Sequence, residues 1–193
     1  MKKILILALA LMSINAWAQH SEHHSETTHE THQAEEAHHG KHKLAFYYGF
    51  THVPSAFYEH ETHVESTGKW VPTIGIDYYY ALNKRWDLGL IGDAELDQYY
   101  IRTSEEDELE RANVVVVSAV AKYKATKRIG IFAGPGFETE FKKEEAKSFF
   151  VFKAGIEYEV EIEKGWELAP ILSYDFKEEY SSYAFGISIG KRF

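Results

Sequence analysis

The feature that most constrains this chain is a period-two alternation of hydropathy that recurs in eight stretches of about ten residues. One face of each stretch is nearly continuous aromatic and aliphatic, whereas the other carries glycine, small residues and charges. Side chains of a β-strand point alternately to opposite faces, so this pattern predicts strands. The predicted strands are 44–51, 70–80, 86–97, 113–123, 129–138, 150–159, 166–176 and 183–193. The register of Asn113 to Tyr123 is the least defined, because it depends only on Ser118 and Lys122.

The connections between these strands alternate between short and long. The short ones are 81–85, 124–128 and 161–165, and the long ones are 54–68, 98–111, 139–148 and 177–182. This asymmetry is typical of outer-membrane barrels, in which short turns face the periplasm. Ten residues rising about 3.4 Å each and tilted by about 40° cover about 26 Å, which is close to the height of the apolar band. We therefore expect both ends of the barrel region on the periplasmic side.

The sign of the alternation separates a membrane barrel from a soluble one of the lipocalin kind. The second face carries most of the strand charges: Asp77, Asp87, Asp93, Glu95, Lys122, Lys153, Glu157, Glu159, Glu167 and Arg192. An eight-stranded barrel has an interior just wide enough for side chains. Placing the charged face inside as an ion-pair network, and the aromatic face toward lipid, satisfies both faces. The prediction is an all-β, eight-stranded antiparallel transmembrane β-barrel over residues 44–193.

The N-terminal residues have a different character. Lys2 and Lys3 precede a short apolar run, and Ala16-Trp17-Ala18 fits a signal-peptidase site, so residues 1–18 are predicted to be a cleaved signal peptide. Asn15 interrupts the run too early for a membrane-spanning helix, which needs about 20 apolar residues. Residues 19–43 are predicted to form a disordered, flexible tail, since they are too polar to offset the entropy of ordering.

This tail is the clearest candidate for metal chemistry. It holds eight of the eleven histidines: His20, His23, His24, His29, His32, His38, His39 and His42. Imidazole is a good ligand for Zn, Cu and Ni, and the repeated His-x-x-His spacing brings pairs together in any conformation. The alternative is a solvated spacer whose histidines merely titrate.

Composition removes several other classes of function. The chain has no cysteine, which excludes disulfides, Cys-based zinc sites and a thiol nucleophile. Its formal charge of −9 argues against nucleic acid as a partner. The long loops are acidic, which indicates either a soluble surface or one that shares the bridging Mg²⁺ or Ca²⁺ of lipopolysaccharide. A lipid-modifying enzyme would need a His paired with a Ser near the outer rim, where only Ser55 and Ser66 lie close to a histidine.

Three parts of the chain resemble a known family. The ending Tyr183-Ala184-Phe185-Gly186-Ile187-Ser188-Ile189-Gly190-Lys191-Arg192-Phe193 resembles the C-terminal insertion signal of bacterial outer-membrane barrels. Residues 131–136 and 168–174 are similar to strands of small porin-like barrels of the OmpX and OmpW type. The resemblance implies insertion by the barrel-assembly machinery of a Gram-negative outer membrane, with lipid and lipopolysaccharide as neighbours. The family is functionally diverse and transfers no activity.

From these observations we expect a monomeric, non-enzymatic outer-membrane barrel with a structural or interaction role in the cell envelope. Eight strands leave no wide channel, so it should not be a general diffusion pore. The main alternative is a metal-linked barrel whose His-rich periplasmic tail binds Zn, Cu or Ni. A lipid-modifying outer-membrane enzyme is the more distant alternative.

Overall fold

The computed structural model describes residues 40–60, 63–65, 68–102, 108–140 and 147–193. All of them belong to one compact unit, His38–Phe193. The predicted signal peptide and all of the predicted tail up to residue 39 lie outside the described residues.

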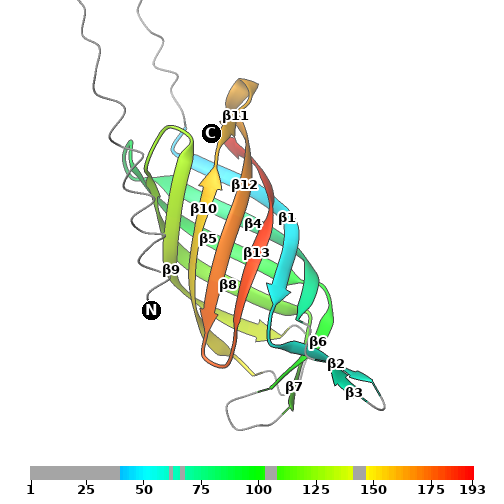
Figure 1. The fold of residues 1–193 in the computed structure, drawn as a ribbon. Coiled ribbons are helices and arrows are strands. Elements are labelled where there is room, and N and C mark those ends of the chain that lie inside the picture. The colour runs from blue at the N-terminus through cyan, green and yellow to red at the C-terminus, as the bar shows by residue number, and fades with distance from the viewer. Residues whose placement is uncertain (1–39, 61–62, 66–67, 103–107, 141–146) are drawn as a thin grey trace, which may run out of the picture. The chain divides into compact units, whose positions relative to one another are not determined.

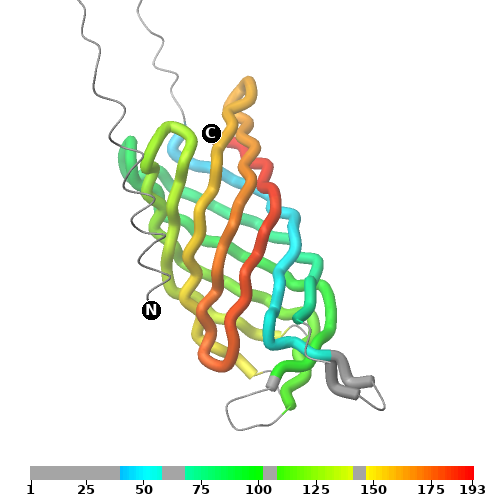
Figure 2. Tube along the Cα trace, viewed as in Figure 1, coloured from blue at the N-terminus to red at the C-terminus, as the bar shows by residue number. Residues whose placement is uncertain are grey.

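Eight long antiparallel strands form a closed barrel (Figure 1). Their order around the ring is β1, β4, β5, β8, β9, β10, β12 and β13, and β13 pairs with β1 to close it. The bounds are β1 His42–Val53, β4 Lys69–Ala81, β5 Trp86–Glu95, β8 Val114–Lys124, β9 Ile129–Glu140, β10 Phe149–Tyr158, β12 Trp166–Lys177 and β13 Ser181–Arg192. The strands run obliquely around the barrel (Figure 2). The predicted eight-stranded barrel is confirmed.

The closing seam lies between β1 and β13. Their pairing runs from Lys43 opposite Arg192 to His52 opposite Tyr183. Beyond it, the N–H of His42 donates to the carbonyl of Phe193 at 3.0 Å, and the N–H of Phe193 donates back at 2.8 Å. The seam therefore starts at the end of the barrel that carries the three short turns, here called the short-turn end.

Several strands are longer than the sequence pattern predicted, and in β1, β9 and β12 charged residues account for the extension. β1 begins at His42, so His42 and Lys43, which were assigned to the tail, belong to the barrel. β9 continues to Glu140 and β12 to Lys177. The reason is the same in each case: charged side chains inside the barrel continue the period-two pattern where apolar ones stop.

The uncertain strand, β8, has the register that Ser118 and Lys122 indicated, with both buried inside. The segment Gly134-Pro135-Gly136 of β9 forms no bulge. The β8–β9 register is the same on both sides of Pro135, from Ser118 opposite Gly136 to Ala121 opposite Ala133. Two pairs are simply missing from the ladder, because proline has no N–H to donate.

The opposite end, here called the long-loop end, carries structure that the sequence pattern did not predict. Residues expected as loops form a four-stranded sheet of β3 (His63–Glu65), β2 (Ala56–His60), β6 (Gln98–Arg102) and β7 (Glu108–Ala112), in that spatial order. At the short-turn end, β11 (Val160–Glu161) and a single 3₁₀ turn (Glu163–Gly165) lie between β10 and β12.

Within the described residues, no helix is long and apolar enough to cross a membrane.

Candidate functional site in the barrel lumen

The outer face of the barrel is an apolar surface suited to lipid. Phe46, Ile76 and Phe137 are 48%, 60% and 64% exposed. Most large side chains that face outward are likewise aromatic or aliphatic. Aromatic rings gather at both edges. Trp70 packs against His52 and Tyr183 at the long-loop end, and Trp86 packs against Tyr123 at the short-turn end. An apolar band between two aromatic belts is the signature of a membrane-spanning barrel, and the fold is therefore a transmembrane one.

The inner face is charged and closely packed. Because successive side chains of a strand alternate, the residues that follow each lipid-facing aromatic point into the lumen. Buried charged residues from all eight strands meet there and form three layers along the barrel. The predicted interior ion-pair network is confirmed, and it is larger than the sequence indicated.

The first layer lies at the short-turn end and is balanced in charge. Four cations face four carboxylates in it, namely Lys43, Lys122, Lys124 and Arg192 against Asp87, Glu157, Glu159 and Glu167. Lys43 Nζ lies 2.7 Å from Glu159 and 2.6 Å from Glu167. Lys122 Nζ lies 2.5 Å from Glu157 and also sits over the ring of Tyr79. Charges buried so deeply are costly unless they are paired.

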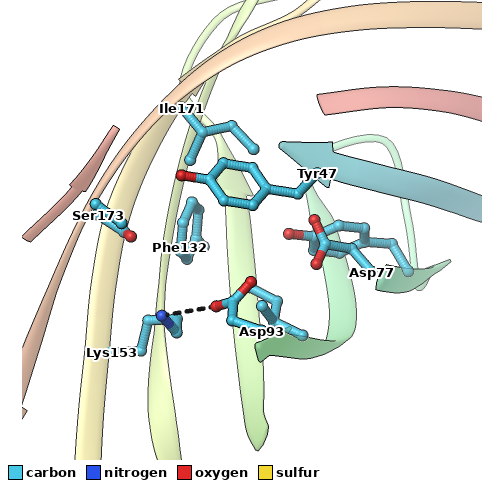
Figure 3. A pocket seen from close by; sticks show the side chains of 10 residues that line it. Tyr47, Asp77, Asp93, Phe132, Lys153, Ile171 and Ser173 are labelled. Carbon is cyan, nitrogen blue, oxygen red and sulfur yellow. Dashed lines mark ion pairs between the residues drawn. The ribbon is translucent and has the colours of Figure 1, made fainter. Parts of the chain in front are cut away.

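The middle layer is unbalanced, because it holds three aspartates and one lysine, which pairs with two of them. Lys153 Nζ lies 3.1 Å from Asp93 (Figure 3) and 2.7 Å from Asp175. Asp77 is only 3% exposed and makes no ion pair with any described residue. Neither its Oδ1 atom nor the hydroxyl of Tyr47 has a hydrogen-bond partner among the residues that the structure describes.

A small cavity lies among these middle-layer groups. Its volume is about 20 Å³, and Tyr47, Asp77, Asp93, Lys153 and Ser173 contribute to its wall (Figure 3). By the same measure a single water needs about 10–15 Å³, so the space fits about one water molecule. A water there could serve the two unpartnered groups. The cavity is too small for a solute.

The third layer closes the long-loop end. Arg111 is fully buried and lies 2.5 Å from Glu138 and 3.2 Å from Glu140. Tyr180 donates a hydrogen bond to Glu138 at 2.5 Å, and burial raises the pKa of the Tyr180 phenol above its usual range. The hydroxyl therefore stays protonated as a donor.

An apolar cluster covers this third layer and continues under the four-stranded sheet. Its members are Val53, Ala56, Val71, Tyr99, Ile101, Val114, Val116, Phe149, Val151 and Tyr180. At its edge Lys69 lies 2.8 Å from Asp97. Burial acts to raise the pKa of Asp97, but hydrogen bonds from Lys69 and from the Gln98 N–H, with the Lys69 charge, lower it overall. The long-loop end is thus sealed by both charge pairing and packing.

Of the eight predicted metal-ligating histidines, only His42 lies within the described residues. It is part of β1, where Nδ1 is 2.7 Å from the hydroxyl of Tyr78 and the ring stacks on Phe193. His42 is therefore an anchored barrel residue, whereas the remaining seven lie outside the described residues. Across the described ranges, no group of three or more His, Asp or Glu side chains is arranged to hold a metal ion.

The His–Ser pair that a lipid-modifying enzyme would need is not assembled in the described structure. His52 packs between Trp70 and Tyr183, with ring centroids 4.6 and 4.7 Å away. Its buried Nδ1 has no hydrogen-bond partner among the described residues. Ser55 lies in the exposed turn between β1 and β2, and Ser66 is not described.

Comparison with known proteins finds similar solved structures only at low sequence identity. No protein-family model and no curated protein sequence matches the chain. Among solved structures, Ail of Yersinia pestis is 17% identical, with a TM-score of 0.46, over 80% of this chain and 99% of that one. The N-terminal β-barrel domain of Pseudomonas aeruginosa OprF is 13% identical, with a TM-score of 0.48, over 80% of this chain and 99% of that one. Neisserial surface protein A is 8% identical, with a TM-score of 0.48, over 80% of this chain and 98% of that one. At these values no ligand, partner or activity can be carried over.

Proposed function

We propose that this protein is a non-enzymatic barrel of a Gram-negative outer membrane, with a structural or interaction role in the envelope. The observation that carries the proposal is the packed lumen. Three layers of buried ion pairs fill it, and the space left among the middle-layer groups fits about one water molecule. A barrel built in this way presents its outer surface and its loops, not its interior, to other molecules.

The orientation follows from the loop asymmetry. The short-turn end would face the periplasm, and the long-loop end, with its extra sheet, would face outward. Lipid would cover the apolar band, and lipopolysaccharide would surround the long-loop end. The barrel-assembly machinery is the expected route of insertion, and a monomer is the expected state because the ring closes on itself without an open edge.

The sealed lumen makes a direct prediction about conductance. Protein reconstituted into a planar bilayer should show no large, sustained single-channel current, because a charged solute would have to displace buried ion pairs. Insertion is verified independently by the shift in gel mobility between unheated and boiled samples. Porin-like steady conductance from protein that shows this shift would refute the proposed role. Absence of the shift in detergent and lipid would refute the membrane barrel itself.

A metal-linked role of the His-rich tail is the second candidate. Eight histidines within 24 residues, several in His-x-x-His pairs, support it. Removing residues 20–39 should leave the folded barrel intact, since β1 begins at His42, and should abolish Zn²⁺ binding. Metal binding requires neutral imidazole, whose pKa is ~6.5, so affinity should be much lower at about pH 5.5 than at about pH 7.5. Calorimetry that finds equal binding at both pH values would contradict histidine ligation.

A further inference from the structure

Two turns at the short-turn end repeat one pattern: a polar residue, Lys, Arg and an apolar residue. The first turn, between β4 and β5, is Asn83-Lys84-Arg85-Trp86. Asn83 Oδ1 accepts hydrogen bonds from the N–H groups of Arg85 at 2.8 Å and Trp86 at 3.0 Å. The N–H of Asn83 donates to the carbonyl of Trp86 at 3.3 Å and closes the turn.

The second turn, between β8 and β9, is Thr126-Lys127-Arg128-Ile129 and has the same hydrogen bonds. Thr126 Oγ1 accepts from the N–H groups of Arg128 at 3.1 Å and Ile129 at 2.9 Å. The N–H of Thr126 donates to the carbonyl of Ile129 at 3.3 Å. Both turns are thus fixed by their own side chains and present a Lys-Arg pair in the same way.

These turns are held side by side. β5 pairs with β8, and the N–H of Lys124 donates to the carbonyl of Arg85 at 2.8 Å. The four basic residues therefore form one surface, here called the twin-turn patch (Lys84, Arg85, Lys127 and Arg128).

The patch has the charge and exposure of a binding surface. Arg85, Lys127 and Arg128 are exposed, and none of them forms an ion pair with a carboxylate within the described part of the chain. The side chain of Arg128 donates to the hydroxyl of Tyr158 at 3.0 Å, which leaves other guanidinium donors for a ligand. The third short turn differs, because Glu161 and Glu163 outnumber Lys164 there. The positive charge is thus concentrated on two of the three turns.

The position of the patch indicates the ligand. Trp86 and Tyr123, whose ring centroids are 5.0 Å apart, lie at the base of the two turns. Leu88 and Ile131 follow on the same outer face and are each 49% exposed, as expected of the apolar band. Aromatic rings of this kind sit at the level of the lipid headgroups. The patch therefore lies at or just beyond headgroup depth.

We propose that the twin-turn patch binds the phosphate groups of anionic phospholipids in the membrane leaflet at the short-turn end. The guanidinium group matches phosphate geometry with paired N–H donors, and basic residues near an anionic surface are attracted to it. The two fixed turns hold the donors in place before the lipid arrives. This inference rests on the proposed membrane role.

The test compares two double variants of the full-length protein. Arg85→Gln with Arg128→Gln removes two charges from the patch. Lys164→Gln with Lys191→Gln removes two charges from the same end of the barrel and outside the patch. Each folded protein is extracted from micelles containing equal amounts of phosphatidylglycerol and phosphatidylcholine, and the retained lipids are counted by native mass spectrometry at low and at high salt.

We expect the unaltered protein and the Lys164/Lys191 variant to retain phosphatidylglycerol preferentially, and less so at high salt. The Arg85/Arg128 variant should lose this preference by on the order of tenfold. An equal loss in both variants, or no preference in the unaltered protein, would overturn the proposal. Because the gel-mobility shift first establishes that each protein is folded, such a result would leave the membrane role standing, whereas failure of all three proteins to fold would count against that role.

Discussion

Replacing Lys153 with Met should lower the free energy of unfolding of the barrel by about 3–5 kcal/mol, because it leaves buried charges without their partner. Lys153 is 2% exposed and is the cation of the middle layer, with Asp93 and Asp175 at 3.1 and 2.7 Å. Met keeps most of the volume of the side chain, so the loss is electrostatic. The change in the free energy of unfolding is measured by urea unfolding in lipid vesicles, monitored by the gel-mobility shift and by tryptophan fluorescence.

Two further variants show whether charge is the cause. Asp175→Asn in the Lys153→Met background should recover part of the lost stability, since it removes one of the orphaned carboxylates. Asp77→Asn in the unaltered protein should be neutral or stabilising, because Asp77 has no ion-pair partner among the described residues. A Lys153→Met barrel as stable as the unaltered one would contradict the account of the middle layer.

Replacing Gly134 with Ala should prevent efficient folding of the barrel or destabilise it by several kcal/mol. A Cβ atom on Gly134 would meet the backbone of the neighbouring strand, with the carbonyl oxygen of Ala119 and the Cα of Val120 both far inside contact distance. Backbone atoms cannot rotate away, so β8 and β9 would have to separate near Pro135, where two ladder pairs are already missing. The fraction of protein that acquires folded gel mobility in detergent measures the effect.

Gly92 provides the matched control. It also lies in a barrel strand, but a Cβ there would have only the carbonyl oxygen of Ile76 nearby, at 3.6 Å, an ordinary contact. Gly92→Ala should therefore fold as well as the unaltered protein. If both variants folded equally well, the close approach of β8 and β9 would be wrong.

The sequence was sufficient to predict the barrel because lipid and lumen impose opposite demands on neighbouring residues. Phe46 and Tyr47, for example, are both aromatic. The alternation places Phe46 in lipid and Tyr47 in the lumen, as observed. The same pattern also placed Lys122, Lys153 and Arg192 inside. Residues at strand ends were harder to assign, because the period-two alternation there merges with the polar sequence of the loops.

Most of the long-loop layer was missed for this reason. Arg111, Glu140 and Lys177 are charged and sit next to loops, so they were counted as loop residues, although they are buried. Lys43 was assigned to the tail in the same way. Extending the period-two pattern by one inward position would have found Lys43, Glu140 and Lys177. Arg111 could not be found so, because it lies on β7, in a sheet formed by loop segments that pair with one another at long range.

The seam between β1 and β13 has a consequence for how the protein reaches its membrane. The paired strands are those of the barrel that lie farthest apart in the sequence, so the ring cannot close until β13 has been synthesised and delivered. Until then β1 and the strand most recently added to the sheet each have an edge of unpaired N–H and C=O groups. Such unpaired groups are unfavourable in hydrocarbon. Insertion strand by strand into bare lipid is therefore unfavourable, and such non-local pairing is also slow. Between synthesis and closure, these two edges are the part of the chain most open to pairing with other strands.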